Sequence, residues 1–257
     1  IKNNMNILNN FNIIFNDIKN IYQTRFNEFI NVLSAFITIL LIRFIIIGLN
    51  NLFINDNYSI QYFVFYIATS ILMMGLEIGL IKLIFKFIDS NIKSQFEIFN
   101  YFHLLKKYFF GLIIFYFLLF LSIIPSLIFM AVKTNYEILS IIKNSIDDIY
   151  FQQLISSYFT NLDFFIIAIL TVTPILYVTI RLCFWNYSLV DQNTLGYQAI
   201  QHSLQLTKGK ELEIILYFII FLIFNVIGVI TIIGMLITIP STYLFFAKYY
   251  RLLKSEI

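Results

Sequence analysis

The sequence predicts an all-α fold: a polytopic bundle of about six transmembrane helices, with both termini cytoplasmic and amphipathic helices at the membrane interface. Of the 257 residues, 60% are hydrophobic and only 12% are charged, whereas a soluble domain carries about 25% charged residues. Long apolar runs recur along the whole chain, so we expect residues 1–257 to form a single integral membrane domain. The net charge of +3 is small and spread out, which argues against a nucleic-acid partner.

The apolar runs have the length that a membrane crossing requires, which is about 20 residues for a helix across ~30 Å of hydrocarbon. The last run, 212–250, is too long for one crossing, and we divide it near residues 230–234 into a hairpin. One crossing followed by a re-entrant segment is the alternative. The predicted spans are residues 30–49, 60–81, 108–132, 164–187, 212–230 and 234–250.

Before the first span, residues 1–29 alternate Asn with Ile, Leu and Phe. We expect a frayed tail over residues 1–10 and an interfacial amphipathic helix over 17–30. No small-residue cleavage site appears here, so no cleavable signal segment is expected. The apolar side of the helix would carry Ile18, Ile21, Tyr22, Phe26 and Phe29.

Three further segments lie between the spans. In residues 95–105, Phe96, Phe99 and Phe102 recur at helical spacing, which predicts a second interfacial helix. The longest loop, 133–163, is acidic and is expected to be external; its Asp147–Asp148 pair is interpreted as a solvated turn. The polar segment 194–209 is predicted to be a cytoplasmic helix, capped at Thr194 and ended at Gly209.

The orientation follows from the basic residues, which stay on the cytoplasmic side. With the N-terminus inside, six spans leave only Lys133 and Lys143 outside and Arg43 within the membrane. All other basic residues are then cytoplasmic. The opposite orientation would place most of them outside, so we reject it.

Several short motifs recur in a fixed order between residues 60 and 252, and together they resemble a known family. The motifs are Gly75–Lys86, Phe96–Phe99, Tyr187–Asp191, Ala199–Ile200, Ser203–Leu204, Leu206–Gly209, Ile239–Pro240, Ala247 and Tyr249–Leu252. The chain resembles the uncharacterised bacterial multi-pass membrane proteins often labelled glycerophosphoryl diester phosphodiesterase membrane-domain-like. The resemblance implies location in the bacterial inner (plasma) membrane, and it does not imply phosphodiesterase chemistry.

The chain departs from this family in two places. Members usually have Pro-Gly near the end of the middle span, whereas here Pro125 precedes Ser126 and Pro174 precedes Ile175. The acidic loop 133–163 resembles an insertion, so the number of spans could differ from that of the family. Within 194–209, the family-like positions are Ala199, Ser203, Thr207, Lys208 and Gly209.

Arg43 and Glu77 are the charged residues that we place inside spans, where insertion costs ~2.5–3.5 kcal/mol each. A direct pair would have to close a vertical offset of ~15 Å. Each side chain could instead reach its own interface, or the two could line a polar path or contact a lipid headgroup. Asn225 is expected to form a hydrogen bond between helices.

Small residues and prolines within the spans are candidates for helix packing. Gly75 and Gly79 form a Gly-xxx-Gly face, for which we favour internal packing over dimerisation. The remaining packing candidates are Pro125, Pro174, Gly228, Gly234 and Pro240.

The sequence offers no arrangement typical of catalysis, and we expect neither a cofactor nor a metal site. His103 and His202 lie in separate segments, without a second His or a carboxylate three or four positions away, so we interpret them as surface histidines. At helix 194–209, His202 and Ser203 are expected to be interface residues. Cys183 is interpreted as a packed thiol, and a single cysteine excludes an internal disulfide.

Three functions remain open. The first is a non-enzymatic accessory or scaffolding protein that acts on membrane partners or lipids. The second is a transporter or lipid-handling permease, with a polar path near Arg43 and Glu77. The third is an intramembrane enzyme, which the absence of a catalytic motif makes the weakest. The expected partners are the lipid bilayer and a membrane protein or a second copy of this chain.

Overall fold

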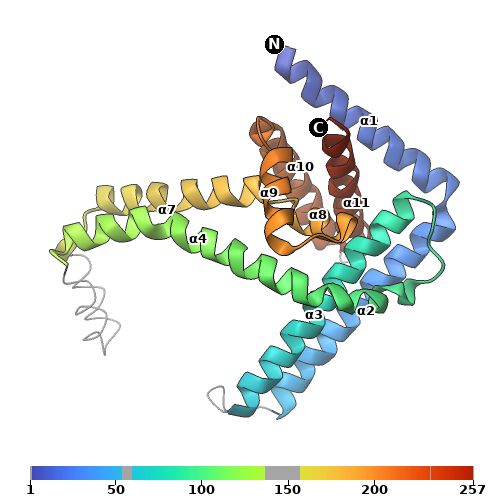
Figure 1. The fold of residues 1–257 in the computed structure, drawn as a ribbon, viewed down its shortest axis with the longest axis horizontal. Coiled ribbons are helices and arrows are strands. Elements are labelled where there is room, and N and C mark those ends of the chain that lie inside the picture. Colours follow the sequence, from blue (N-terminus) through green and yellow to red (C-terminus); the bar gives the residue numbers. More distant parts are fainter. Residues whose placement is uncertain (1, 54–59, 137–156, 232, 257) are drawn as a thin grey trace. The chain divides into compact units, whose positions relative to one another are not determined.

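The computed structural model describes residues 2–53, 60–136, 157–231 and 233–256. No strand occurs among these residues, which confirms the all-α class. The elements are α1 (Lys2–Thr24), α2 (Phe26–Phe53), α3 (Ile60–Ile88), the 3₁₀ helix η1 (Gln95–Leu104), α4 (Leu105–Lys133), α7 (Asn161–Arg181), α8 (Trp185–Gln192), α9 (Gly196–Leu206), α10 (Glu211–Ile230) and α11 (Ile233–Ser255) (Figure 1).

The protein is a membrane protein, because long apolar helices are present. Within the described residues, four helical segments are long and apolar enough to cross a bilayer: Phe26–Asn50, Gln95–Lys133, Asn161–Gln192 and Glu211–Ile230. Helices α3 and α11, which the sequence predicts as spans two and six, are not among these four. The count of six spans therefore stays a prediction.

Where the sequence predicts a single domain, the contacts divide the helices into two compact units. The first contains residues 1–111 and 184–257, and the second contains residues 112–183. In the second unit, Lys133 and Asp163 form an ion pair of 2.9 Å between the end of α4 and the start of α7. Asp163 also completes a capping box with Thr160, which fixes where α7 begins. Both helices continue past their prolines, Pro125 and Pro174.

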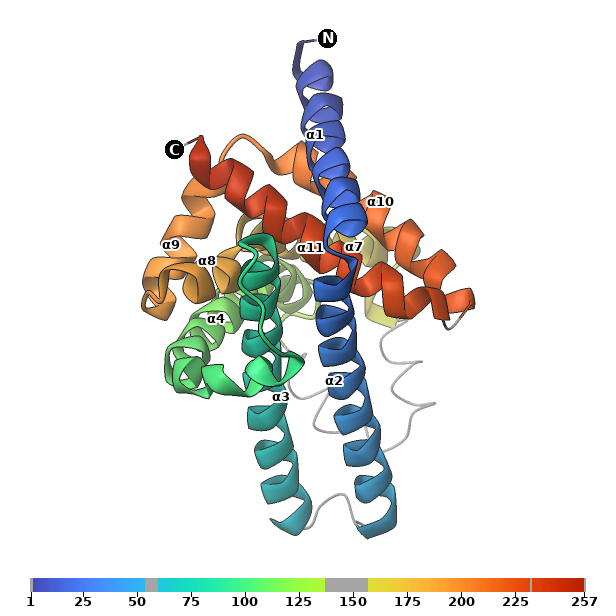
Figure 2. The same ribbon diagram turned by 90° about the vertical axis from the view of Figure 1, so that its right-hand side faces the viewer.

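The first unit is built on the paired helices α2 and α3, which lie side by side in both views (Figures 1 and 2). Their burial is uneven along their length. In α3, the buried residues run from Gly75 to Phe87, and in α2 they run from Phe29 to Phe36. The opposite halves carry exposed apolar side chains such as Phe44 and Ile60, at 75% and 79% exposure.

Helices α8, α9 and α11 complete the buried end of this unit. Phe184, Ala199 and Ala247 are each 0% exposed, and α11 contacts α2, α3 and α9. We call this part the hub: residues 29–36, 75–87, 184–206 and 244–254. The hub encloses the core, whereas the far halves of α2, α3 and α10 expose the apolar surface that hydrocarbon would cover.

The N-terminal segment differs from the prediction. The expected frayed tail over residues 1–10 is wrong for residues 2–10, because α1 is one helix from Lys2 to Thr24. It is fastened to α10 by two hydrogen bonds: Asn10 donates to Glu213 at 3.0 Å, and the Tyr217 hydroxyl donates to the Ile7 carbonyl at 3.0 Å. The chain then turns and continues as α2 (Figure 1). Phe26, expected on the apolar face, is 60% exposed.

The glycine face of α3 packs against η1 inside the chain. A Cβ on Gly75 would lie 2.5 Å from the Phe102 ring, and a Cβ on Gly79 would lie 2.0 Å from the Ile98 carbonyl oxygen. An ion pair between Lys86 and Glu97 joins the same two elements. Because both glycines face η1, internal packing accounts for them without a second copy.

Helices α10 and α11 form the hairpin that the sequence predicts, with the turn between Ile230 and Ile233. A Cβ on Gly228 would lie 2.3 Å from the Thr238 hydroxyl oxygen, so the helices approach closely near this turn. A Cβ on Gly234 would be equally crowded, at 2.2 Å from the Thr231 hydroxyl oxygen. Pro240 is buried within α11, which continues past it.

Candidate functional site

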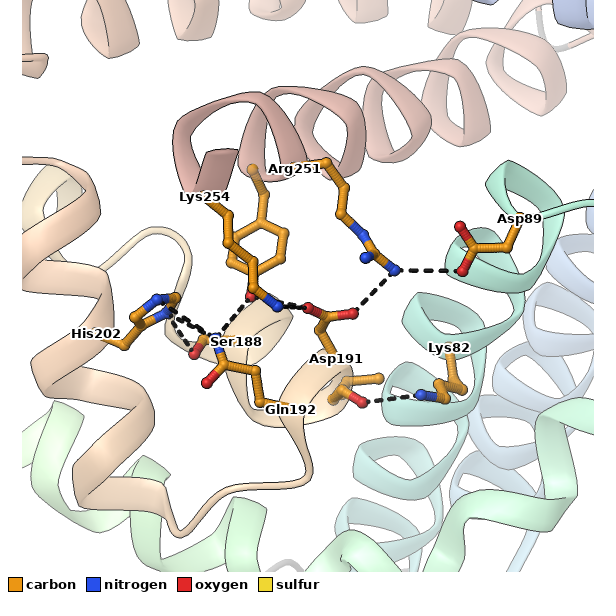
Figure 3. Close-up of polar contacts among 10 residues, drawn as sticks. Lys82, Asp89, Ser188, Asp191, Gln192, His202, Arg251 and Lys254 are labelled. Carbon is orange, nitrogen blue, oxygen red and sulfur yellow. Dashed lines mark hydrogen bonds and ion pairs between the residues drawn. The ribbon is translucent and has the colours of Figure 1, made fainter. Parts of the chain in front are cut away.

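The polar centre of the hub is the carboxylate of Asp191, whose side chain is only 7% exposed. Three residues from the end of α11 converge on it (Figure 3). Lys254 Nζ lies 2.7 Å from Oδ2, Arg251 Nη2 lies 2.9 Å from Oδ1, and the Tyr250 hydroxyl donates to Oδ2 at 3.2 Å. A buried carboxylate with these partners joins α8 firmly to α11.

Arg251 extends this cluster to α3. Its Nη2 also lies 3.3 Å from Asp89 Oδ2, and its guanidinium stacks over the Phe85 ring at 4.9 Å from the centroid. Phe85 is only 2% exposed. A cation over a buried aromatic face adds to the ion pairs, so one arginine holds α3, α8 and α11 together.

Lys82 forms a second connection between α3 and α8. Its Nζ donates to the Val190 carbonyl at 3.2 Å, in the last turn of α8. Burial lowers the pKa of this ammonium, Arg251 and Lys86 act in the same direction, and Asp191 and Asp89 oppose them. A lysine at a helix C-terminus also interacts favourably with the helix dipole.

His202 on α9 completes the cluster. Its Nδ1 lies 2.9 Å from Ser188 Oγ and 3.3 Å from Gln192 Nε2, both on α8 (Figure 3). Burial and then the Lys254 charge lower the pKa of His202, while Asp191 opposes the shift. His202 is partly buried where α9 meets α8, which agrees with the expected interface residue and makes it less exposed than a surface histidine. His103, in contrast, is exposed.

A serine hydrogen-bonded to a histidine is a pair found in nucleophilic catalysis. Such a role requires that a substrate can reach the Ser188 hydroxyl. Ser188 is 0% exposed and lies in the middle of α8. A substrate cannot reach its hydroxyl in this arrangement. The Ser188–His202 pair therefore serves as a hydrogen bond between α8 and α9. In the described parts of the chain, no group of three His, Cys, Asp or Glu side chains is suited to hold a metal.

The family-like positions of the segment 194–209 explain how α9 is seated. Ala199, Ser203 and Thr207 are each 0% exposed, and Ser203 Oγ accepts a hydrogen bond from the Phe184 backbone at 3.2 Å. Lys208 is exposed, and Gly209 has a φ of +75° just beyond the helix, as expected for its end.

The expected cap at Thr194 is wrong. Helix α9 begins at Gly196, with Leu195 in the N-cap position. The Leu195 N–H is satisfied instead by the Gln198 side chain at 3.2 Å. The start of α9 is fixed by close packing, since a Cβ on Gly196 would lie 2.4 Å from the Gly111 nitrogen.

The predicted fourth span is not one helix. Helix α7 ends at Arg181 and α8 begins at Trp185, so the chain is broken at residues 182–184. The break frees the Phe184 N–H for Ser203, as described above. Cys183 lies in this break as a free, partly buried thiol.

The intramembrane candidates do not form one site. Arg43 is exposed on α2, and no ion pair joins it to Glu77 within the described ranges. The Glu77 carboxylate is partly buried and hydrogen-bonds Tyr108. Asn225 Nδ2 donates to Thr242 Oγ1 at 3.0 Å, which confirms the expected hydrogen bond between helices.

Sequence reasoning missed the residues at the centre of the cluster. The sequence places Asp191 only within a family-like motif, Arg251 in such a motif and among the cytoplasmic basic residues, and Lys254 only among those basic residues, while Asp89 has no predicted part. The sequence signal for this cluster is weak, because the Tyr250 and Lys254 contacts to Asp191 span 59 and 63 positions.

Comparison of the chain with family models, with curated proteins and with solved structures found no match.

The His202 geometry predicts a pH effect on stability. A lowered folded-state pKa means that the folded protein favours neutral His202. The stability that neutral His202 contributes is complete above the ordinary histidine pKa of about 6.5 and is lost as the pH falls below it. We expect the thermal unfolding midpoint in detergent to fall between pH 7.5 and 5.5, with a smaller fall in His202→Gln. His103→Gln is the control and should behave as wild type; equal slopes in all three proteins would contradict the prediction.

Proposed function

We propose that the protein is a non-enzymatic accessory component of the bacterial inner membrane, which uses its hub as a rigid cytoplasmic platform for a membrane-protein partner. The observation that supports this proposal is that the charged groups of the Asp191 cluster are paired with one another. Its acidic group is buried and paired with Arg251 and Lys254, and Arg251 also pairs with Asp89 at the end of α3. Such a cluster fixes geometry and leaves no free nucleophile at its centre.

The outer faces of the hub and of η1 support the same function. Helix α9 buries one side and presents Tyr197, Gln201 and Gln205 on the other. Beside them, Leu195 is 48% exposed, and on η1 Phe96 is 61% exposed. Exposed aromatic and apolar side chains among polar ones are typical of a docking surface.

The orientation of the chain in the membrane is part of this proposal. Under it both termini are cytoplasmic, and the exposed apolar halves of α2, α3 and α10 lie in the bilayer. The resemblance to the phosphodiesterase-membrane-domain-like family supports a bacterial origin.

The proposal is tested with a photo-crosslinking amino acid at Gln201 in intact cells, and with the same residue at Thr231 as control. Gln201 is exposed on the hub, whereas Thr231 is exposed at the far turn of the α10–α11 hairpin. We expect one protein to crosslink at Gln201 and not at Thr231, and to co-elute with the native chain in mild detergent at constant stoichiometry. Retained lipid without a crosslinked or co-eluting protein would overturn the accessory function.

That opposite outcome would favour the alternative, a transporter or lipid-handling permease. One observation supports this alternative: Glu77 contacts a phenol, Tyr108, and none of the described cations lies within ion-pair distance of it. An ionisable side chain in a membrane helix without a counter-charge is a functional candidate.

A further inference from the structure

Two neighbouring cavities lie between α1 and the α10–α11 hairpin. One has a volume of about 440 Å³ and is lined by α1 and α10; the other, of about 260 Å³, is lined by α1, α10 and α11. Phe11 and Ile220 line both. The cavities therefore form one elongated groove, which we call the α1–α10 groove.

The polar atoms along this groove are already used. The Tyr217 hydroxyl contacts the Ile7 carbonyl at 3.0 Å and Glu213 Oε1 at 2.9 Å. At the other end, the Tyr22 hydroxyl donates to Ser241 Oγ at 2.8 Å, and Ser241 donates to the Ile237 carbonyl. A molecule in the groove thus finds aliphatic and aromatic carbon, so its own bound part has to be apolar.

The groove is continuous with the membrane-facing surface of α10. Its wall residues Leu216, Ile220 and Phe224 are 45%, 43% and 41% exposed, and they adjoin Ile223 and Ile227, at 54% and 59%. The whole of α10, Glu211–Ile230, is one of the segments suited to cross a bilayer. A lipid chain can therefore enter the groove sideways from the hydrocarbon layer.

The lining of the groove suits a single hydrocarbon chain. Its walls are aliphatic and aromatic side chains of α1, α10 and α11, and the hydroxyls along it are already hydrogen-bonded. A flexible chain can pass from one cavity to the other past Phe11 and Ile220.

We propose that the α1–α10 groove binds one acyl chain of a bilayer glycerophospholipid and holds α1 against the hairpin through it. The chain would lie between the aromatic residues of α1 and the wall of α10, where two helices contact it at once. This binding requires only that α10 lies in a bilayer, so it holds whether or not the hub binds a protein partner.

The test uses the full chain in detergent micelles, where loosely associated lipid is diluted away. The probe is a phosphatidylcholine with a photoactivatable group in its acyl chain, and crosslinked positions are mapped by mass spectrometry. We expect crosslinks on Phe11, Phe15 and Phe224. Ile220→Trp, which fills the junction of the cavities, should lower them by about tenfold.

Ile223→Trp is the matched control, because Ile223 is exposed on the same helix and does not line the groove. It should retain the crosslinks. Leu8→Trp, which fills the larger cavity from α1, gives a second variant if Ile220→Trp does not yield folded protein. Crosslinks of equal strength on Phe44 and Ile45 of α2, or groove crosslinks that persist in both filling variants, would overturn the proposal.

Discussion

Replacement of Asp191 by Asn is expected to lower the free energy of unfolding by about 2–4 kcal/mol, because Arg251 and Lys254 would keep their charges without the buried carboxylate between them. This range lies below the usual cost of breaking a buried pair, since the basic side chains are 35% and 36% exposed. The measurement is unfolding of the purified protein in mixed micelles with increasing denaturing detergent.

The matched control for Asp191→Asn is Asp17→Asn. Asp17 also pairs with a basic residue of α11, Lys248, at 3.4 Å, but its side chain is 54% exposed. An exposed pair contributes about 0–1 kcal/mol. Equal effects of the two substitutions would show that burial at Asp191 does not strengthen the cluster. A double-mutant cycle of Asp191→Asn with Arg251→Gln then isolates the coupling between them.

Replacement of Gly79 by Ala is expected to destabilise the protein by about 1–3 kcal/mol, although alanine is the better helix former. The added Cβ would lie 2.0 Å from the Ile98 carbonyl oxygen, and this atom belongs to the backbone of η1. A backbone atom cannot move aside as a flexible side chain can, so α3 and η1 would have to separate. The same unfolding measurement reports the loss.

Gly48→Ala supplies the control for this prediction. Gly48 lies in α2, and nothing lies within 4 Å of a Cβ built there. Its replacement should be neutral or should stabilise by about 0.5–1 kcal/mol, as alanine does within helices. Gly79→Ala should therefore destabilise the protein, whereas Gly48→Ala should not. If Gly79→Ala also stabilised the protein, close packing of α3 on η1 would be refuted.

The sequence predicted those features that depend on neighbouring residues. The hairpin turn between Ile230 and Ile233 was predicted within one residue at α11, because glycines interrupt an apolar run that is too long for one crossing. The end of α9 near Gly209 followed from local chemistry in the same way. The hydrogen bond of Asn225 was predicted because a polar side chain in a span needs a partner.

The predictions that were wrong concern features that depend on tertiary contacts. Thr194 has the right side chain for a cap, yet the approach of Gly196 to Gly111 sets the start of α9. The break at residues 182–184 is stabilised by Ser203 from the next helix but one. Neither contact appears in local periodicity. Asp191 likewise looked ordinary in sequence, since its partners lie on α11 and become neighbours only when the hub forms.

The position of the core at one end of the helices has a consequence for biosynthesis. Residues 29–36 and 75–87 emerge from the ribosome early, but Tyr250, Arg251 and Lys254 are among the last of the described residues to emerge. Insertion of the apolar segments can therefore precede hub assembly, while Asp191 waits without its counter-charges. Closure of the hub thus marks a fully synthesised α11, and a nascent chain that stops short of it presents an open, unpaired surface to the quality-control machinery of the cell.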